Sequence, residues 1–474
     1  MKLALPKPLM SAGVLVLGAA ALAFAIVLFT PSVLNDGDTY WHIAAGRWML
    51  DNHAVLRIDP FSYTFAGHPW QTHEWLAEGV MALAYMGAGW NGVVILFGCA
   101  AALTAGLLAL HLSRWLGGLS LAVTLLLALA CVAGSLLARP HLLALPILEA
   151  WAAGLVIARA EGRAPSWKFL PLMTLWANLH ASFLFGLVLI VPFACEAVLE
   201  KPDARAAALR RWGLFAAAAT AMALLTPYGI YGLIFPFHLM AMPSLALVKE
   251  WGPTDFRIFQ PLAFAVAAAL YVLLSRGVRI KPLRILVLLA LLYLALIHTR
   301  SHMLIAIVGA LILAEPLAQG LGVQRFAGKL RYNLSVVFGF VAVLVLLAGL
   351  RVLLPLERVD GATTPATAFA QVPVALTKTP VFNDYAFGGY LIFNDVRPYI
   401  DSRVELYGND FISRYAAMIR PDRSALEAML ARRHIRWTIL APDNPAVGVL
   451  DTMSGWHRLT ADRWAVVHVR DGEP

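Results

Sequence analysis

The feature that most constrains this chain is a series of long apolar runs. They hold about 17 to 22 residues each and are separated by short breaks that contain charged residues, Pro or Gly. A helix needs about 20 such residues to cross the hydrocarbon core of a bilayer. Because no water reaches backbone polar groups there, each run must satisfy its own hydrogen bonds as a helix. The runs therefore predict a polytopic α-helical membrane protein.

Composition supports this prediction. Hydrophobic residues make up 60% of the 474 residues and charged residues only 14%, whereas soluble domains have about 25% charged residues. The basic start and the long first run favour an uncleaved first helix over a signal peptide. The segment 168–179 is too short to cross alone, and WANLHASF, which begins at its end, is either an outer turn or a break inside the membrane. We expect about eleven crossings, near residues 10–31, 92–112, 119–137, 141–158, 168–179, 182–198, 213–226, 259–275, 283–298, 302–319 and 333–355.

The net charge of +9 is a topology signal and does not indicate nucleic-acid binding, because the basic residues lie in short loops between the apolar runs. With the N-terminus inside, seventeen Lys and Arg residues fall on the cytoplasmic side and six fall in the opposite loops before the last helix. Positive charge favours the cytoplasmic side. We therefore expect a multi-pass protein of the cell (inner) membrane, with a cytoplasmic N-terminus and an extracytoplasmic C-terminus.

Two regions do not have the composition of membrane spans. The first outer loop, about residues 32–90, contains WHIAAGRWMLDNH, which we interpret as a helix along the membrane surface with Trp41 and Trp48 in the headgroup layer. The second region, 356–474, predicts a small extracytoplasmic α/β domain after a transmembrane domain of residues 1–355. Its predicted strands are VFNDYAFGGYLIF, RWTILAP and RWAVVHVRD, and its predicted helix is PDRSALEAMLARRHI.

Polar side chains gather on the predicted outer side. Ionisable groups near a membrane are costly and mark function more often than chance. Snorkelling, capping or headgroup contact explains any one of them, but does not explain why they share a face. The set comprises Asp36, Asp38, His42, Asp59, His73, Glu74, Arg139, His141, Asn178, His180, Tyr228, Glu250, Arg300 and His302.

Asp36 and Asp38 form an Asp-x-Asp pair directly after the first crossing. Two carboxylates so placed either hold a divalent cation against a phosphate or provide a general base. The alternative is helix capping, since Asp before TYWHIAAGRWML satisfies free amide groups. In the C-terminal region, Asp401, Arg403 and Glu405 alternate along YIDSRVELYG and share a face if that segment is a strand, either as an acceptor-binding edge or as a solvated surface.

The run DTYWHIAAGRWML, followed by GHPWQTHEWLAE, resembles the first outer loop of the GT-C superfamily of polyprenyl-phosphate-sugar-dependent glycosyltransferases. The resemblance places Asp38 on the catalytic aspartate of the family, and His73 and Glu74 on the loop that faces the site. Two features depart from the usual pattern: Thr39 follows the aspartate where many members have Glu, and Thr72-His73-Glu74 replaces a Lys-Pro-Pro segment. WANLHASF, TPYG, KEW, FNDYAFGGYLIF and YIDSRVELYG resemble a poorly characterised bacterial branch.

The resemblance implies an inverting transfer in which an outer-face aspartate deprotonates an acceptor that displaces polyprenyl phosphate. The implied partners are membrane lipids, a polyprenyl-phosphate-sugar donor and an acceptor that is a lipid, glycan or protein. No cofactor is required, although Asp36 and Asp38 could share Mg or Mn. We take Asp38 and Asp36 as the catalytic pair. The candidate substrate-binding residues are His73, Glu74, Arg139, His141, His180, Glu250, Arg300 and His302.

Arg139 and Arg300 are our candidates for the donor phosphate, which arginine binds well; the alternative for each is an ordinary boundary arginine. Other functions remain open: a transporter or flippase of lipid-linked glycan, which favours inverted repeats, or a glycan polymerase or ligase. We find no internal repeat, and Glu149 is the one acidic residue that we place near the membrane midplane.

Overall fold

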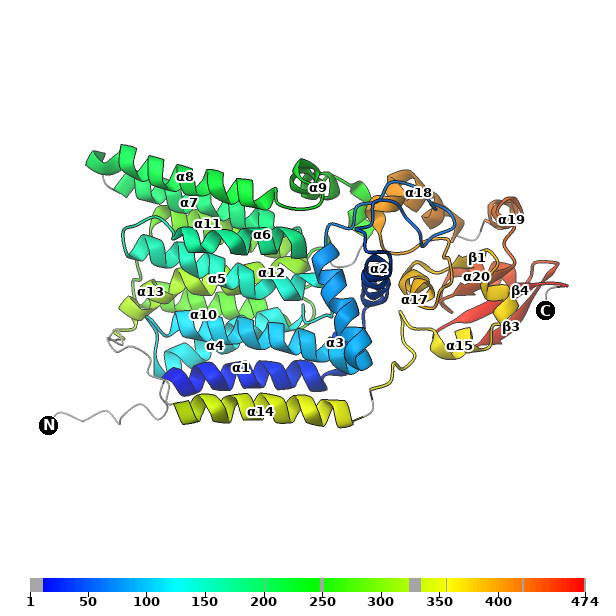
Figure 1. Ribbon diagram of the computed structural model, residues 1–474, viewed down its shortest axis with the longest axis horizontal. Helices are drawn as coiled ribbons and strands as arrows, with labels where there is room; N and C mark the ends of the chain where they lie inside the picture. Colours follow the sequence, from blue (N-terminus) through cyan, green and yellow to red (C-terminus); the bar gives the residue numbers. More distant parts are fainter. Residues whose placement is uncertain are drawn as a thin grey trace.

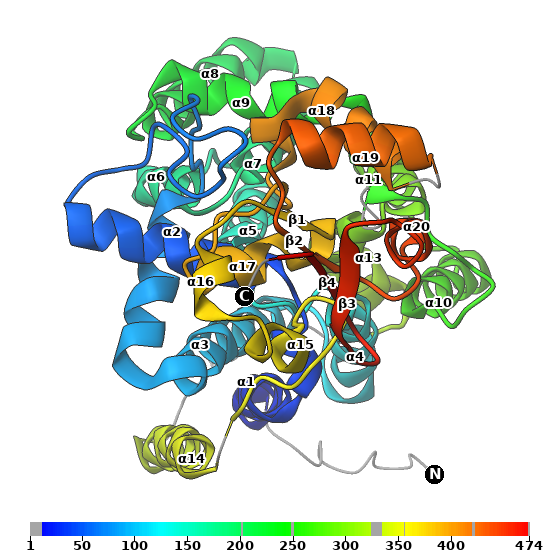
Figure 2. The same cartoon turned by 90° about the vertical axis from the view of Figure 1, so that its right-hand side faces the viewer.

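A computed structural model describes residues 12–200, 202–247, 251–323, 334–354, 356–419 and 422–472. It has two parts, a bundle of long helices and a smaller α/β part that covers one end of the bundle (Figure 1). We call this end the α/β end. Viewed from that end, α2 lies across the ends of bundle helices (Figure 2).

Each of the eleven predicted spans contains a helix within its described residues. Among the described residues, five helices are long and apolar enough, by length and composition, to cross a membrane, and five more are apolar but shorter. The bundle comprises α1 (Ala12–Phe29), α3 (Trp75–Leu112), α4 (Gly118–Ala133), α5 (Pro140–Ala160), α6 (Leu170–Leu179), α7 (Phe183–Glu200), α8 (Arg205–Ala223), α10 (Pro261–Ser275), α11 (Pro282–Ile297), α12 (His302–Leu304), which continues through a π-helical turn (Ile305–Gly309) into α13 (Ala310–Gly320), and α14 (Leu334–Leu353). The number of crossings stays a prediction.

Two helices differ from the expectation. α3 begins at Trp75, so residues 75–87 are helical where a loop was predicted, and the chain bends at Ala88 and Gly89 before the expected span. Gly89 has a positive φ of 56°, which glycine adopts without strain. An additional helix, α9 (Ile230–Met240), follows α8. It has eleven residues, too few to cross a bilayer, which is why a search for spans missed it.

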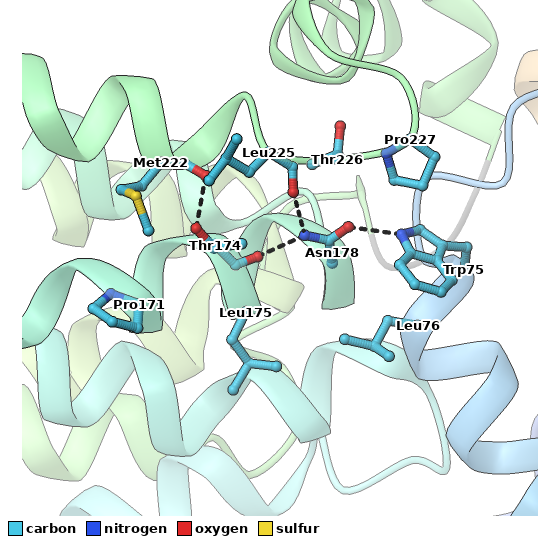
Figure 3. A pocket seen from close by; sticks show the side chains of 10 residues that line it. All are labelled: Trp75, Leu76, Pro171, Thr174, Leu175, Asn178, Met222, Leu225, Thr226 and Pro227. Carbon is cyan, nitrogen blue, oxygen red and sulfur yellow. Dashed lines mark hydrogen bonds between the residues drawn. The ribbon is translucent and has the colours of Figure 1, made fainter.

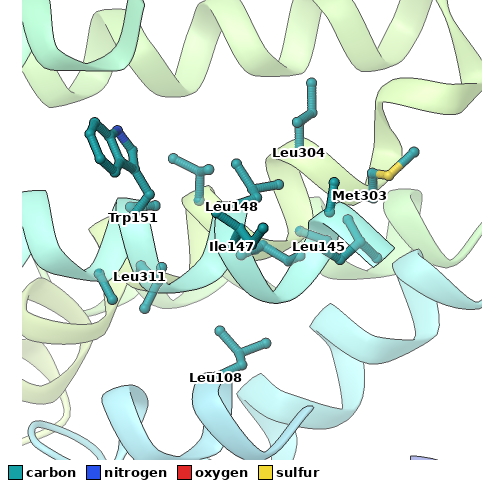
Figure 4. Packing of buried hydrophobic residues seen from close by; sticks show 14 of the residues in the cluster. Leu108, Leu145, Ile147, Leu148, Trp151, Met303, Leu304 and Leu311 are labelled. Carbon is teal, nitrogen blue, oxygen red and sulfur yellow. The ribbon is translucent and has the colours of Figure 1, made fainter. Parts of the chain in front are cut away.

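The interior of the bundle is built around α5, whose Leu145, Leu148 and Trp151 are buried together with Leu108 and Leu311 from neighbouring helices (Figure 4). The indole nitrogen of Trp151 donates a hydrogen bond to the carbonyl of Gly186 at 2.9 Å. Buried and lipid-facing side chains are equally apolar in a membrane protein. Composition alone therefore could not predict which face of each helix is interior.

The α/β part contains a four-stranded sheet in the order β1-β2-β4-β3, in which β1 and β2 are parallel and the other pairs are antiparallel. Strands at VFN, WTIL and VVHVR and a helix over Arg423–Arg432 confirm the corresponding predictions. The division between residues 355 and 356 stays a prediction. The elements are α15 (Ala366–Ala370), α16 (Val374–Thr377), β1 (Val381–Asn383), α17 (Gly388–Phe393), α18 (Val404–Met418), α19 (Arg423–Arg432), β2 (Trp437–Leu440), α20 (Pro445–Leu450), β3 (Trp456–Ala461) and β4 (Val466–Arg470).

Part of one predicted strand is a helix, and the conditional interpretation of a second segment as a strand was wrong. The segment GGYLIF forms α17 and packs against α2. In YIDSRVELYG, residues 399–403 form a loop and α18 begins at Val404, so Asp401, Arg403 and Glu405 do not alternate along a strand. Asp401 and Arg403 are buried, which also excludes the solvated surface. Their burial results from tertiary contacts with the first outer loop, which the local pattern does not encode.

The helix expected along the membrane surface is α2 (Asp38–Asn52), but Trp41 does not lie in the headgroup layer. Trp41 is buried, and its indole nitrogen donates to the hydroxyl of Ser402 at 3.0 Å. Arg358 adds a second connection, because its Nε donates to the Tyr40 hydroxyl at 2.9 Å. The α/β part thus covers the side of α2 that the sequence suggested would face lipid headgroups.

Backbone contact between the two parts leads to a prediction. A Cβ atom added at Gly389 would overlap the Gly37 carbonyl oxygen, whereas one added at Gly448 on α20 meets nothing within 4 Å. Gly389→Ala should therefore destabilise the protein by about 1–3 kcal/mol, the usual cost of overpacking. Thermal unfolding of both variants in detergent measures this. Equal melting temperatures for Gly389→Ala and Gly448→Ala would contradict the packing described here.

Candidate active site at the α/β end

The Asp36-Gly37-Asp38 turn leads into α2 and gives its two carboxylates different roles. Asp36 Oδ1 accepts a hydrogen bond from the Asp38 backbone N–H at 2.7 Å, so Asp36 performs the capping. Asp38 is the first residue of the helix, and its carboxylate contacts Ser402 and Arg139. The capping interpretation therefore applies to Asp36 and leaves the Asp38 carboxylate available for other partners.

Arg139, immediately before α5, bridges both carboxylates. Its Nε lies 2.6 Å from Asp36 Oδ2, and its Nη2 lies 3.0 Å from Asp38 Oδ2. The Asp38 and Arg139 side chains keep 19% and 21% exposure, so a substrate can reach this ion pair. Arg139 was predicted to bind an anion, and in this structure the anions are the two aspartates.

Ser402, from the α/β part, is the second partner of Asp38. Its hydroxyl accepts a hydrogen bond from Trp41 at 3.0 Å and donates its own hydrogen to Asp38 Oδ1. The neighbours of Ser402 hold it in place: Arg403 donates to Asp401 and, at 2.7 Å, to Asp59 of the first outer loop. The α/β part therefore contributes a side chain directly to the site.

This arrangement also tests the predicted divalent cation. All four carboxylate oxygens of Asp36 and Asp38 already contact donors: the Asp38 amide, the Ser402 hydroxyl and the Arg139 guanidinium. As arranged, this donor set does not fit a metal ion, since Arg139 would have to leave first. The described residues contain no group of three or more His, Cys, Asp or Glu that could hold a metal ion. Metal dependence stays a prediction that an assay after chelation would test.

A second group of titratable residues surrounds Glu74, just before α3. Glu74 Oε1 lies 3.6 Å from His73 Nε2 and 3.4 Å from His180 Nε2, while Glu74 Oε2 lies 3.7 Å from His42 Nε2. His42 also contacts Glu78 at 3.2 Å. We call His42, His73, Glu74, Glu78 and His180 the Glu74 cluster. It stands beside the Asp38 site because the His42 ring stacks on Trp41, with centroids 3.7 Å apart.

Hydrogen bonds assign the proton on His180. Its Nδ1 accepts from the Ser182 backbone N–H at 3.0 Å. Burial and the nearby Arg300 guanidinium lower the pKa of His180 to about 3, so the ring is neutral at physiological pH. With Nδ1 acting as an acceptor, the single ring proton resides on Nε2, which faces Glu74. Ser182 in turn accepts from Trp176 at 2.9 Å, which holds this arrangement in place.

The His73–Glu74 pair predicts a pH dependence. Burial alone would lower the pKa of His73, but the Glu74 carboxylate outweighs it and raises that pKa above the ordinary 6.5. Burial likewise opposes ionisation of Glu74, yet His73 and the other histidines hold its pKa well below the usual range. The stability from His73 is therefore present at low pH and is lost as pH rises through its raised pKa. The stability from Glu74 is lost at acid pH.

We therefore expect the melting temperature to fall as pH rises above 6.5 in the wild type, and to fall less in His73→Gln. Melting curves in detergent across neutral and alkaline pH measure this difference. The exposed His457, replaced in the same way, controls for general effects of losing a histidine. Parallel pH profiles for wild type and His73→Gln would show that this pair has no such role.

A pocket of about 180 Å³ lies beside these groups and is lined by three predicted residues, His141, Arg300 and His302, together with Gln260 and Thr299. We call it the Arg300 pocket. His302 Nε2 lies 2.8 Å from the Thr254 hydroxyl, and the Arg300 guanidinium stacks over the Trp251 ring at 4.6 Å. The pocket neighbours the Glu74 cluster, since the His141 and His180 ring centroids are 6.2 Å apart.

A second cavity is an apolar groove of about 500 Å³ (Figure 3). It lies between the start of α3, α6 and the end of α8, and Trp75 and Asn178 form its polar end, joined by a hydrogen bond of 2.7 Å. Trp75 directly follows Glu74. The polar end of the groove therefore adjoins the Glu74 cluster.

Two solved structures resemble the chain over most of its length. The Archaeoglobus fulgidus oligosaccharyltransferase in the apo form matches with a TM-score of 0.56 and 12% identity, over 90% of this chain and 69% of that one. ArnT from Cupriavidus metallidurans bound to undecaprenyl phosphate matches with a TM-score of 0.51 and 12% identity, over 96% of this chain and 97% of that one. This chain has the GT-C fold. No family model and no curated protein matches the sequence.

On the GT-C fold, nine of the ten predicted site residues are described, and all nine lie in three neighbouring groups at the α/β end. Glu250 lies outside the described residues. Sequence reasoning did not assign Ser402, Trp41 or Glu78 to the site. The only available signal for Ser402 was its place in YIDSRVELYG, between the residues that we considered as one face of a possible strand.

Proposed function

We propose that this protein is an inverting glycosyltransferase that moves a sugar from a polyprenyl-phosphate donor to an acceptor hydroxyl or amine. One observation carries the proposal: an accessible carboxylate, Asp38, is held at the start of α2 by an arginine and a serine. The GT-C fold supports it, since ArnT of the same fold was crystallised with undecaprenyl phosphate.

In this proposal Asp38 accepts the proton of the acceptor as the acceptor oxygen or nitrogen attacks the anomeric carbon. The bond from that carbon to the phosphate oxygen breaks, and polyprenyl phosphate leaves with the electron pair. Arg139 must first release Asp38. A donor phosphate offers the guanidinium an alternative anion, which arginine binds through paired hydrogen bonds. Arrival of the donor would thereby free the base.

The surrounding cavities suit the rest of the donor. The Arg300 pocket offers a cation and neutral hydrogen-bonding groups beside the site, which suits phosphate or sugar hydroxyl groups. The apolar groove at Trp75 and Asn178 suits part of a polyprenyl chain. The predicted excess of basic residues in the loops at the opposite end supports an extracytoplasmic position of the α/β end, where the transfer would occur.

Ser402 offers a test of the role of the α/β part. Ser402→Ala removes the hydroxyl that donates to Asp38. We expect transfer to fall about tenfold, which corresponds to about 1.4 kcal/mol, near the lower end of the contribution of a hydrogen bond to a charged group. Ser402→Thr retains the hydroxyl and should recover most activity. Full activity of Ser402→Ala would exclude this contact from the mechanism.

The function itself is tested with the purified protein in vesicles that contain polyprenyl-phosphate sugars, supplied with panels of hydroxyl and amine acceptors. We expect release of polyprenyl phosphate and a product of inverted anomeric configuration. If the protein instead carried the intact lipid across the bilayer without release of phosphate, the flippase alternative would replace this proposal.

A further inference from the structure

Helix α9 presents an apolar surface that no other described segment covers. Of its eleven residues, IYGLIFPFHLM, only Pro236 is buried. The side chains of one face are between 39% and 66% exposed: Ile230, Tyr231, Ile234, Phe237 and Met240. Such a continuous apolar face is unusual for a surface in water and marks a contact with lipid or another protein.

The position of α9 helps to decide whether its apolar face contacts lipid or another protein. Figure 1 shows α9 nearly end-on, whereas α8 runs along the long axis of the bundle. The axis of α9 therefore crosses the long axis of the bundle, and the helix lies at the α/β end. The Tyr228 hydroxyl, just before α9, donates to the Leu56 carbonyl at 2.9 Å, and the Ser244 backbone N–H, just after it, donates to Asn409 at 3.1 Å. Both ends are thus attached to segments that cover the end of the bundle.

The charge, neighbours and length of α9 indicate that its exposed face contacts lipid. The exposed face contains no charged side chain, and it continues the exposed apolar side chains at the end of α8, such as Leu225 at 59% exposure. Tyr231 and His238 are seven residues apart and therefore share one edge of the helix, where their polar groups can meet headgroups. An apolar helix too short to span a bilayer and lying across the bundle has the properties of an interfacial helix.

We propose that α9 lies in the membrane interface at the α/β end, with Ile230, Ile234, Phe237 and Met240 among the acyl chains. The opposite side of the helix contacts the Glu74 cluster, because Phe235 packs against His73 with ring centroids 4.3 Å apart. The depth of α9 in the bilayer thereby sets the depth of the Glu74 cluster. This inference concerns membrane position and does not require the proposed reaction.

The test uses full-length protein in vesicles of phosphatidylethanolamine and phosphatidylglycerol, with Cys99, Cys131 and Cys195 replaced by serine or alanine. Single cysteines at Ile234 and Phe237 carry a nitroxide spin label. A label at the exposed Leu346 of α14 serves as the lipid reference, and one at the exposed Glu427 of α19 serves as the aqueous reference. We expect both α9 labels to collide with oxygen and avoid water-soluble nickel, as at Leu346.

Collision with nickel, as at Glu427, would overturn the proposal. Immobile labels shielded from both reagents would do so too, since they would indicate a protein partner or a second copy. Photolabelling of the unaltered protein by a phospholipid with a diazirine in its acyl chain asks the same question without any substitution. Adducts within residues 230–240 are expected, and their absence alongside adducts on α14 would contradict the proposal.

Discussion

Replacing Asp38 with asparagine should lower the rate of glycosyl transfer by about 10² to 10⁴-fold, the usual contribution of a general base. Asparagine keeps the shape of the side chain and retains an oxygen for Arg139, but it cannot accept the acceptor proton. Folding should change little, because the cap of α2 is made by Asp36. Turnover in vesicles and thermal unfolding in detergent, measured on the same preparation, separate the two effects.

Asp36→Asn is the matched control. Asparagine caps helices about as well as aspartate, so this variant should lose less activity than Asp38→Asn while it also removes one charge facing Arg139. If both variants lost activity equally, a role shared by the two carboxylates, such as a common cation, would replace the single base. An Asp38→Asn enzyme with full turnover would remove Asp38 from the mechanism.

The largest effect on stability should come from Arg403→Ala. Arg403 is 1% exposed, donates to Asp401 and to Asp59 at 2.7 Å, and stacks over Trp70 at 4.5 Å. Its removal leaves two buried carboxylates without their cation, and breaking a buried ion pair in this way costs about 3–5 kcal/mol. We expect a lower melting temperature and faster proteolysis of the α/β part.

Arg414→Ala is the control for Arg403→Ala. Arg414 lies on α18, the helix that directly follows Arg403, but its side chain is exposed. Exposed substitutions usually change stability by about 0.5 kcal/mol or less. If Arg403→Ala had the same melting temperature and protease resistance as Arg414→Ala, the Asp59–Arg403–Asp401 ion pairs would not stabilise the contact between the first outer loop and the α/β part. Because Ser402 lies between Asp401 and Arg403, a destabilised variant should also lose activity.

Hydrophobic patterning predicted most of the membrane helices because the requirement for apolar residues in lipid is local and strong. It also predicted that the polar residues of the site would converge. A chain that crosses repeatedly brings successive loops to two faces only, so residues as distant as His73 and Arg300 are restricted to one end before any contact is known.

The sequence predictions that were wrong or incomplete share a cause, because contacts with distant segments or with the membrane surface determine the structure at these positions. Trp41 has the amphipathic character of a headgroup residue, but its partner is Ser402, 361 residues away. α17 lies in a segment that alternates like a strand, but its two glycines allow close approach to Ile400 and Gly37. α9 is too short to be recognised as a span from its sequence. In each case a distant segment or the membrane surface decides the structure, and the local sequence does not record it.

The hydrogen bond from Ser402 to Asp38 has a consequence for biosynthesis. Asp38 emerges from the ribosome early, whereas its hydroxyl partner follows 364 residues later, after the described bundle helices have been synthesised. A nascent chain therefore carries the carboxylate without its complete surroundings. The assembled site becomes available only when the last part of the protein has folded onto the first, so truncated or stalled products would reach the bilayer without it.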